Sequence, residues 1–413
     1  MAVLIKDIGI LAGVRDDDSL LRGIALSQLP CLTNAYLIIE GARIAAYGLM
    51  SDLAYNGRDF SEVIDAAGKA VLPSWCDSHT HLVFAGSREN EFVDKIKGLT
   101  YAEIAARGGG ILASAKKLNA TSEEELYKQA AKRLQEVIRV GTGAIEIKSG
   151  YGLTIDGEMK MLRVIKRLKQ AFSMPIKSTF LGAHSFPAAY KENREGYINL
   201  IVDEMLPQIA AEGLADYIDV FCEENFFTPE DTKRICLAGK GYGLKPKIHA
   251  NQLAVSGGVQ AGVSVGAVSV DHLESMDEEA IAALAGSNTI GTLLPTAAFF
   301  LRMPYQPARS LINAGCAIAL ASDYNPGSSP SGNMNLVVSH ACIGMKMLPE
   351  EAINAATING AYAMEVEDES GSIAVGKRAN LILTKEIPSL AYLPYSFGSN
   401  LIDRVMLSGE WVE

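Results

Sequence analysis

Several features that mark membrane and secreted proteins are missing from this 413-residue sequence. No apolar run reaches the ~20 residues needed to span a bilayer. The first residues, Met1 to Asp7, carry charges where a signal peptide needs an unbroken apolar core. None of the six cysteines forms a CxxC pair, and most lie in apolar stretches, which favours reduced, buried thiols. We therefore expect a cytoplasmic protein that does not bind a membrane.

An excess of positive charge is missing too, since 37 Lys and Arg face 48 Asp and Glu for a net charge of -11. So acidic a surface repels nucleic acid, which is therefore not expected as a partner. It does not exclude an anionic small-molecule substrate, because a local arginine in a cleft outweighs a distant field. Neither a GxGxxG fingerprint nor a P-loop follows any predicted strand, which weakens a nucleotide-binding interpretation.

The sequence does contain many apolar residues: 48% of the chain is hydrophobic and 21% is charged. This proportion is sufficient to bury a large core. Both ends have short β-rich runs around turns, at 35–40, 43–47, 371–384 and 405–412. We predict that the two ends join into one small β-sandwich domain. Its parts would be residues 1–70 and 366–413, with residues 71–365 inserted between them.

The middle of the chain alternates between short apolar runs and helical patterns. Helical periodicity is present at 122–140, 158–171 and 197–212, the first with a Ser122 cap and acidic residues in its first turn. The apolar runs number eight: 71–76, 144–147, 176–181, 217–221, 246–248, 267–270, 289–294 and 317–321. Eight such strands separated by helices predict an α/β fold of the (β/α)8 TIM-like barrel class over 71–365.

Polar residues follow the predicted strands at the points where a barrel carries its chemistry. Five of the six histidines of the chain lie there. His79 and His81 are two residues apart in extended backbone, so both rings can face one ion. His249 and Asp323 end two other strands. Three imidazoles and a carboxylate suit zinc, iron or another first-row ion. The alternative is that these histidines have only a structural role. Such an ion lowers the pKa of its water to ~7.

Two of these residues have more than one interpretation. Asp323 is a candidate ligand and also a candidate proton carrier toward a leaving nitrogen. His272 is a candidate fifth ligand, a group that polarises a carbonyl, or a satisfied core histidine.

Other candidates lie in loops beyond the strands. Arg88 is either a carboxylate-binding residue or an ordinary solvated arginine. Tyr151 between glycines, His184 and Gln252 are candidate ligand contacts, and the segment from Asn325 to Ser329 has the composition of a turn. The glycine run 108–110 favours a flexible loop or lid over the site.

Taken together, these residues resemble the imidazolonepropionase family of the amidohydrolase superfamily. The resemblance rests on the paired β ends and on segments from the first barrel strand to the last: Asp77-Ser-His-Thr-His-Leu-Val-Phe-Ala-Gly-Ser-Arg-Glu, Glu146-Ile-Lys-Ser-Gly-Tyr-Gly, Phe180-Leu-Gly-Ala-His, His249-Ala-Asn-Gln-Leu and Ser322-Asp-Tyr-Asn-Pro-Gly-Ser.

This resemblance implies hydrolysis of 4-imidazolone-5-propanoate to N-formimidoyl-L-glutamate in histidine degradation. It implies one Zn(2+) or Fe(3+) per chain, held by His79, His81, His249 and Asp323, with His272 near the metal. It implies substrate contacts from Arg88, Tyr151, His184, Gln252, Asn325, Gly327 and Ser328, and a homodimer. Some relatives carry Glu at position 252, but the neutral amide of Gln252 cannot be a general base. Alternatives are another cyclic amidase, an aminopurine deaminase, or a non-catalytic scaffold.

Overall fold

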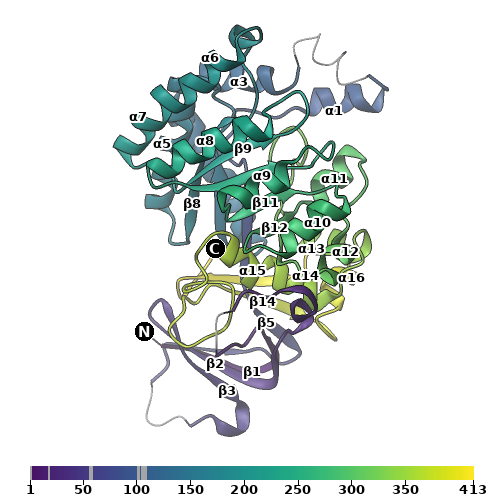
Figure 1. Cartoon of the computed structure of the whole chain (residues 1–413). Coiled ribbons are helices and arrows are strands. Elements are labelled where there is room, and N and C mark those ends of the chain that lie inside the picture. The colour runs from purple at the N-terminus through teal and green to yellow at the C-terminus, as the bar shows by residue number, and fades with distance from the viewer. Residues whose placement is uncertain (1, 17–18, 55–58, 100–102, 104–108) are drawn as a thin grey trace.

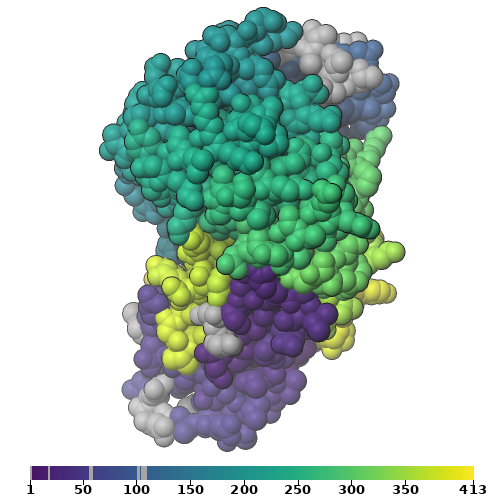
Figure 2. Space-filling view, in the orientation of Figure 1, coloured from purple at the N-terminus to yellow at the C-terminus, as the bar shows by residue number. Residues whose placement is uncertain are grey.

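The computed structural model describes residues 2–16, 19–54, 59–99, 103 and 109–413. It consists of a barrel of parallel strands and a smaller sheet that both ends of the chain build (Figure 1). Figure 2 shows N-terminal and C-terminal residues side by side at one end of the molecule. No helix among the described residues is long and apolar enough to cross a membrane.

The smaller sheet joins the chain ends through an antiparallel pair, in which Ile382 of β14 lies opposite Leu72 of β5. Side chains such as Leu37, Val71 and Met406 form its own buried core. The predicted β domain from both chain ends is confirmed, and its strands form one continuous sheet; the boundaries at residues 70 and 365 stay a prediction. The strands are β1 (Ala2–Ala12), β2 (Cys31–Glu40), β3 (Arg43–Leu49), β4 (Glu62–Asp65), β5 (Lys69–Pro73), β14 (Leu381–Glu386), β15 (Ile402–Leu407) and β16 (Glu410–Trp411).

The barrel has eight parallel strands in sequence order, which confirms the predicted (β/α)8 class. The ring is closed beyond the last strand, where Asp323 N donates to His79 O at 3.0 Å and His81 N donates to Tyr324 O at 2.9 Å. The strands are β6 (Trp75–Thr80), β7 (Thr142–Lys148), β8 (Ile176–Ala183), β9 (Tyr217–Cys222), β10 (Lys245–Ala250), β11 (Ser269–His272), β12 (Ile290–Leu293) and β13 (Ile318–Leu320).

One predicted strand is divided differently. The apolar run at 71–76 is split at Ser74, so that β5 ends in the β domain and β6 begins the barrel. The two sides bond to different partners: Ser74 N donates to Asn380 O at 3.0 Å, and Trp75 N donates to Gly141 O at 2.8 Å. A continuous apolar run does not reveal such a change of partner, because both strands are buried.

Helices surround the barrel. In α4, Ser122 caps the first turn by accepting a hydrogen bond from Glu125 N, as predicted, and Leu126 and Leu134 are buried toward the strands. The pattern at 197–212 comprises α6, a π-helical segment and α7. The helices are α1 (Glu89–Ile96), α3 (Ile111–Ala120), α4 (Glu123–Arg139), α5 (Ile155–Ala171), α6 (Arg194–Asn199), η4 (Leu200–Met205), α7 (Leu206–Glu212), α8 (Pro229–Gly241), α9 (Gly258–Val265), α10 (Glu278–Ala285), α11 (Pro295–Leu301), α12 (Ala308–Asn313), α13 (Met334–Ile343), α14 (Pro349–Ala356), α15 (Ile358–Ala363) and α16 (Tyr392–Tyr395), with 3-10 turns η1 (Gly23–Ser27), η2 (Met50–Asp52) and η3 (Ala188–Tyr190).

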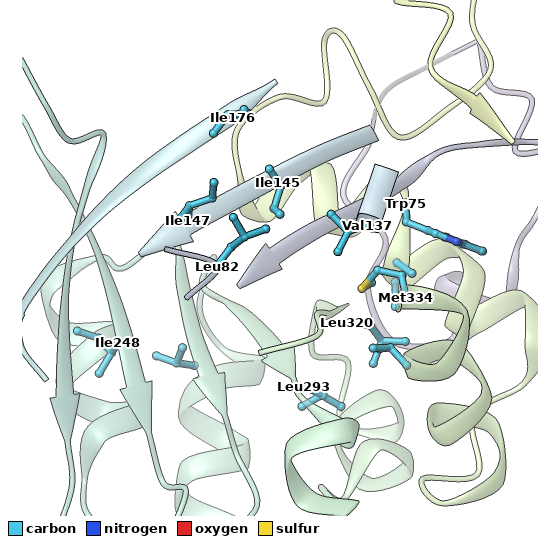
Figure 3. Packing of buried hydrophobic residues seen from close by; sticks show 14 of the residues in the cluster. Trp75, Leu82, Val137, Ile145, Ile147, Ile176, Ile248, Leu293, Leu320 and Met334 are labelled. Atoms are coloured by element: carbon cyan, nitrogen blue, oxygen red, sulfur yellow. The ribbon is translucent and has the colours of Figure 1, made fainter. Parts of the chain in front are cut away.

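The core lies between the strands and these helices. Figure 3 shows Val137 of α4 close to Ile145 of β7, and Leu320 of β13 close to Met334 of α13. All four side chains are buried. This packing makes the strands a rigid frame, on which side chains at the strand ends can be held in fixed positions.

A close approach between α15 and β6 gives a test of that packing. A Cβ on Gly360 would lie 2.5 Å from Cys76 O and 3.1 Å from Cys76 Cβ. Gly360→Ala is therefore expected to push the helix away from the strand and to cost about 1–3 kcal/mol of unfolding free energy, measured from denaturant midpoints. Gly241→Ala is the control, since nothing lies within 4 Å of its Cβ position. Equal midpoints for Gly360→Ala and wild type would contradict the close approach.

Candidate active site

The predicted chemical residues converge at one end of the barrel. His79 lies within β6 and His81 directly after it, while His249 lies in β10 and His272 ends β11. Asp323 follows β13. All five side chains are almost completely buried. Residues from four distant stretches of sequence thus share one site, as their positions at strand ends predict.

The ring nitrogens and the carboxylate face one another. Asp323 Oδ1 lies 3.6 Å from the Nε2 atoms of both His79 and His81, and His81 Nε2 lies 3.3 Å from His249 Nε2. The ligand atoms of His79, His81 and His249 lie within 4.8 Å of one another, as do those of His79, His272 and Asp323. His79 Nε2 is buried and makes no hydrogen bond to a described residue. An unpartnered nitrogen among converging donors fits a metal ion.

Burial sets the charge of this cluster. It lowers the pKa of His79, His81 and His249 well below the ordinary value, further helped by neighbouring cations. The three imidazoles are therefore neutral at pH 7, which is the form that ligates a metal. Burial also raises the pKa of Asp323 to about 6, although His272 and the Ser328 hydroxyl lower it. The site is thus suited to a cation without first requiring the loss of protons from its histidines.

A second layer of carboxylates holds two of the histidines from behind. His79 Nδ1 lies 2.6 Å from Asp271 Oδ2, and since a carboxylate only accepts, the nitrogen donates. His249 Nδ1 lies 3.0 Å from Asp219 Oδ2. The contact with Asp271 directs the lone pair of His79 Nε2 toward the shared space, which is the usual arrangement behind metal-bound histidines. His249 Nδ1 makes no hydrogen bond to a described residue, and Asp219 Oδ1 instead accepts from His249 N at 3.1 Å.

Buried lysines balance those carboxylates. Lys148 Nζ lies 2.8 Å from Asp219 and 3.5 Å from Asp271, and it also pairs with Glu146, which in turn pairs with Lys247. Burial alone would lower the pKa of Lys148, but the three carboxylates outweigh it and raise the pKa. Unpaired charges at this depth would be very costly.

The buried carboxylates and lysines behind the histidines were not predicted from the sequence. Their positions do give an indication, because Asp219 and Lys247 are charged residues inside otherwise apolar runs of predicted barrel strands. Such a residue faces the barrel interior and requires a partner there.

Two residues of the site have unusual backbone conformations. His272 has φ 87° and Asp323 has φ 53°, both in the left-handed region that side chains seldom adopt. The turn after β13 supports Asp323: Asn325 Nδ2 donates to Asp323 O at 2.6 Å, and Ser328 Oγ donates to Asp323 Oδ2 at 3.1 Å. The segment with the composition of a simple turn therefore also positions the carboxylate.

A cavity of about 530 Å³ opens over this cluster. All the predicted substrate-contacting residues line it, together with His81, His249, His272 and Asp323: Arg88, Tyr151, His184, Gln252, Asn325, Gly327 and Ser328. The structure thus brings every predicted site residue except the buried His79 to one cavity wall. Which of them contact a substrate stays a prediction. Of the predicted glycine-run lid, Gly108 lies outside the described residues, and Gly110 N donates to Glu91 Oε1 at 3.0 Å.

The arginine of the cavity is already held in place. Arg88 Nη2 donates to Glu91 Oε2, and both side chains are largely buried. A Cβ on Gly327 would lie 2.3 Å from Arg88 Nη1. The glycine therefore allows the guanidinium to lie directly against the backbone of the loop that carries Asp323.

Comparison with known proteins agrees with this geometry. The model of the amidohydrolase family matches residues 70–412. The chain belongs to the amidohydrolase family. Among curated members, the imidazolonepropionase of Flavobacterium johnsoniae is 58% identical over 411 residues, covering 99% of this chain and 100% of that protein. That of Christiangramia forsetii is 55% identical with complete coverage of both chains, and that of Geobacillus kaustophilus is 43% identical, covering 94% and 92%.

Solved structures confirm the amidohydrolase fold. E. coli guanine deaminase superposes with a TM-score of 0.74 at 13% identity, covering 100% of this chain and 99% of that one. An adenosine deaminase from Xanthomonas campestris with bound zinc gives a TM-score of 0.69 at 16% identity, covering 99% and 92%. At this identity the likeness concerns the fold alone. The family and the His/Asp cluster together indicate a metal ion in this amidohydrolase.

Proposed function

We propose that this amidohydrolase opens the ring amide of 4-imidazolone-5-propanoate, giving N-formimidoyl-L-glutamate in the breakdown of histidine. The observation that carries the proposal is a single cavity whose wall includes three metal-suited side chains, His81, His249 and Asp323, and also the largely buried cation Arg88. The substrate has matching parts, a ring carbonyl to be attacked and a propanoate carboxylate to be held. The names of the relatives that share 43–58% identity support the same activity.

One Zn(2+) or Fe(3+) per chain is the proposed cofactor, with His79, His81, His249 and Asp323 as its ligands. Three neutral imidazoles and one carboxylate are donors that suit both ions. When bound, such an ion acts as a Lewis acid and promotes the ionisation of water at neutral pH.

Asp323 and His272 are the proposed catalytic side chains. The Asp323 carboxylate lies in the wall of the cavity and can take a proton from the attacking water and return it to the leaving ring nitrogen. His272 lies 3.5 Å from Glu274 through Nδ1. Burial lowers the pKa of His272, but the carboxylates Glu274, Asp323 and Asp271 together outweigh burial and raise it. A protonated His272 can stabilise the developing charge on the ring carbonyl oxygen. Gln252 has no part in proton transfer.

The remaining residues orient the substrate. His184 Nδ1 lies 3.1 Å from Gly150 O, and because a carbonyl only accepts, His184 Nδ1 is the donor. Its Nε2 is therefore free to accept a hydrogen bond from a ring N–H. Tyr151, whose pKa burial raises, stays protonated and can donate. Gln252 and the loop residues Asn325, Gly327 and Ser328 complete the proposed contacts.

Arg88→Met tests the proposed binding of the carboxylate. The methionine removes a charge-assisted hydrogen bond from the ground state and the transition state alike, which raises KM and leaves kcat unchanged. We expect KM for imidazolonepropanoate to rise by about 10- to 100-fold, measured in a coupled assay with fresh substrate. A ring without the propanoate tail should show no difference between wild type and variant. An unchanged KM for the full substrate would remove this role from Arg88.

The same assay separates the alternatives. A panel of cyclic amides and aminopurines detects a different amidase or a deaminase on the shared scaffold. A non-catalytic scaffold would purify with far less than one ion per chain and would stay inactive after metal addition. Cytoplasmic location and a homodimer stay predictions, which fractionation and light scattering can test.

A further inference from the structure

Helix α1 and its N-cap carry three charged residues on one face, of which Arg88 and Lys95 line the cavity. Arg88 is its N-cap, and Glu91 and Lys95 follow at spacings of three and four residues, which places them on one helix face. The helix lies at the end of the barrel remote from the β domain (Figure 1). Like Arg88, Lys95 lines the cavity above the His/Asp cluster. The cavity therefore has two cations where the sequence suggested one.

The two cations differ in their partners. Arg88 already pairs with Glu91, whose other oxygen accepts from Gly110 N, so this pair is formally neutral. Among the described residues, Lys95 Nζ donates to one acceptor, the backbone carbonyl Gly327 O at 3.4 Å, and it forms no ion pair with any of them. A half-buried ammonium group that has a neutral acceptor alone still has donors available for an anion.

Electrostatics favour an anion beside Lys95. Burial lowers its pKa, and the nearby Arg88 lowers it further, against the weaker opposite effect of Glu91. A carboxylate placed near both cations would offset that cost. With Arg88 balanced by Glu91, Lys95 supplies the positive charge that makes this end of the cavity attractive to a carboxylate.

We propose that Lys95 is a second substrate-binding cation, which together with Arg88 holds the propanoate carboxylate and so selects rings that carry an acidic tail. This inference rests on the proposed function, because that function supplies the anionic tail. Glu91 acts as a positioning residue: it accepts a hydrogen bond from Arg88 Nη2 and so fixes the guanidinium at the cavity wall.

Binding of imidazole-4-propanoate tests the proposal without any turnover, since this analogue has the tail but no ring amide to hydrolyse. Calorimetry on metal-loaded protein is expected to show Lys95→Met binding it about 10- to 100-fold more weakly than wild type. Binding of 4-methylimidazole, which lacks the tail, should be unchanged. Lys97→Met is the matched control, because Lys97 is exposed two residues further along and does not line the cavity. Lys95→Arg should restore most of the affinity.

Kinetics provide the second readout. Lys95→Met is expected to raise KM for imidazolonepropanoate with little change in kcat, and added salt should reduce the difference in KM between the variant and wild type.

Equal affinity of wild type and Lys95→Met for the tailed analogue, while Arg88→Met weakens that affinity, would overturn the role of Lys95 and leave the proposed function intact. Absence of turnover in wild type would instead overturn the proposed function, and the binding series would still decide whether Lys95 holds a carboxylate. If Lys95→Met fails to fold, Lys95→Gln replaces it.

Discussion

His249→Ala is expected to abolish most of the activity of this amidohydrolase. The side chain supplies one of the three imidazoles in the cluster, and its Nε2 lies 3.3 Å from that of His81. Lewis-acid stabilisation contributes several kcal/mol, and each 1.36 kcal/mol is a factor of ten in rate. The expected fall in kcat/KM is therefore on the order of a thousandfold or more. Metal content after dialysis should fall together with the rate.

His340 offers the matched control for this change. It is the one histidine of the chain outside the active site, half-buried on α13 with Tyr305 Oη at 2.9 Å from its Nδ1. His340→Ala should keep both metal and rate close to wild type. A His249→Ala protein that retains a full ion and near-normal turnover would rule out the proposed ligand set and the mechanism built on it.

Much of the fold could be predicted from the sequence because the barrel repeats one simple pattern. Eight buried strands must each be short and apolar, and the amphipathic helices between them show clear caps such as Ser122. The division within 71–76 was missed because two strands of different domains are both buried and only the buried residue Ser74 separates them. Strand β1 was not predicted, because its charged residues Lys6 and Asp7 interrupt the apolar pattern of a buried strand.

The candidate site was predictable to the extent that its residues lie at strand ends. His79 and His249 each lie one residue before the end of a strand and Asp323 lies just beyond one, so barrel geometry alone brings them together. The residues behind them follow no such rule. Whether a charged residue inside a strand, such as Asp219, supports a ligand or merely pairs with a lysine depends on contacts across the barrel, here with His249 and Lys148. Lys95 could not be predicted by this rule, because it lies on a helix rather than at a strand end.

Asp323→Asn separates the two roles proposed for this carboxylate. The amide keeps the size of the side chain and can still accept from Ser328 Oγ, which lies 3.1 Å from Asp323 Oδ2. It cannot carry a proton at neutral pH. Because His79, His81 and His249 remain, we expect metal affinity to fall only modestly. Proton transfer by a positioned side chain contributes about 10²- to 10⁴-fold to the rate. We therefore expect kcat to fall by at least ~10²-fold, while KM for imidazolonepropanoate changes little.

The comparison with His249→Ala makes the outcome interpretable. If Asp323 acted only as a ligand, the Asp323→Asn protein would lose metal and rate in parallel, as His249→Ala is expected to do, and excess metal in the assay would restore much of the rate. Asp323→Asn should instead hold its ion through dialysis and stay slow at every metal concentration. Rates near wild type in the fully loaded variant would show that another group moves the proton, and His272 would then be the next side chain to replace.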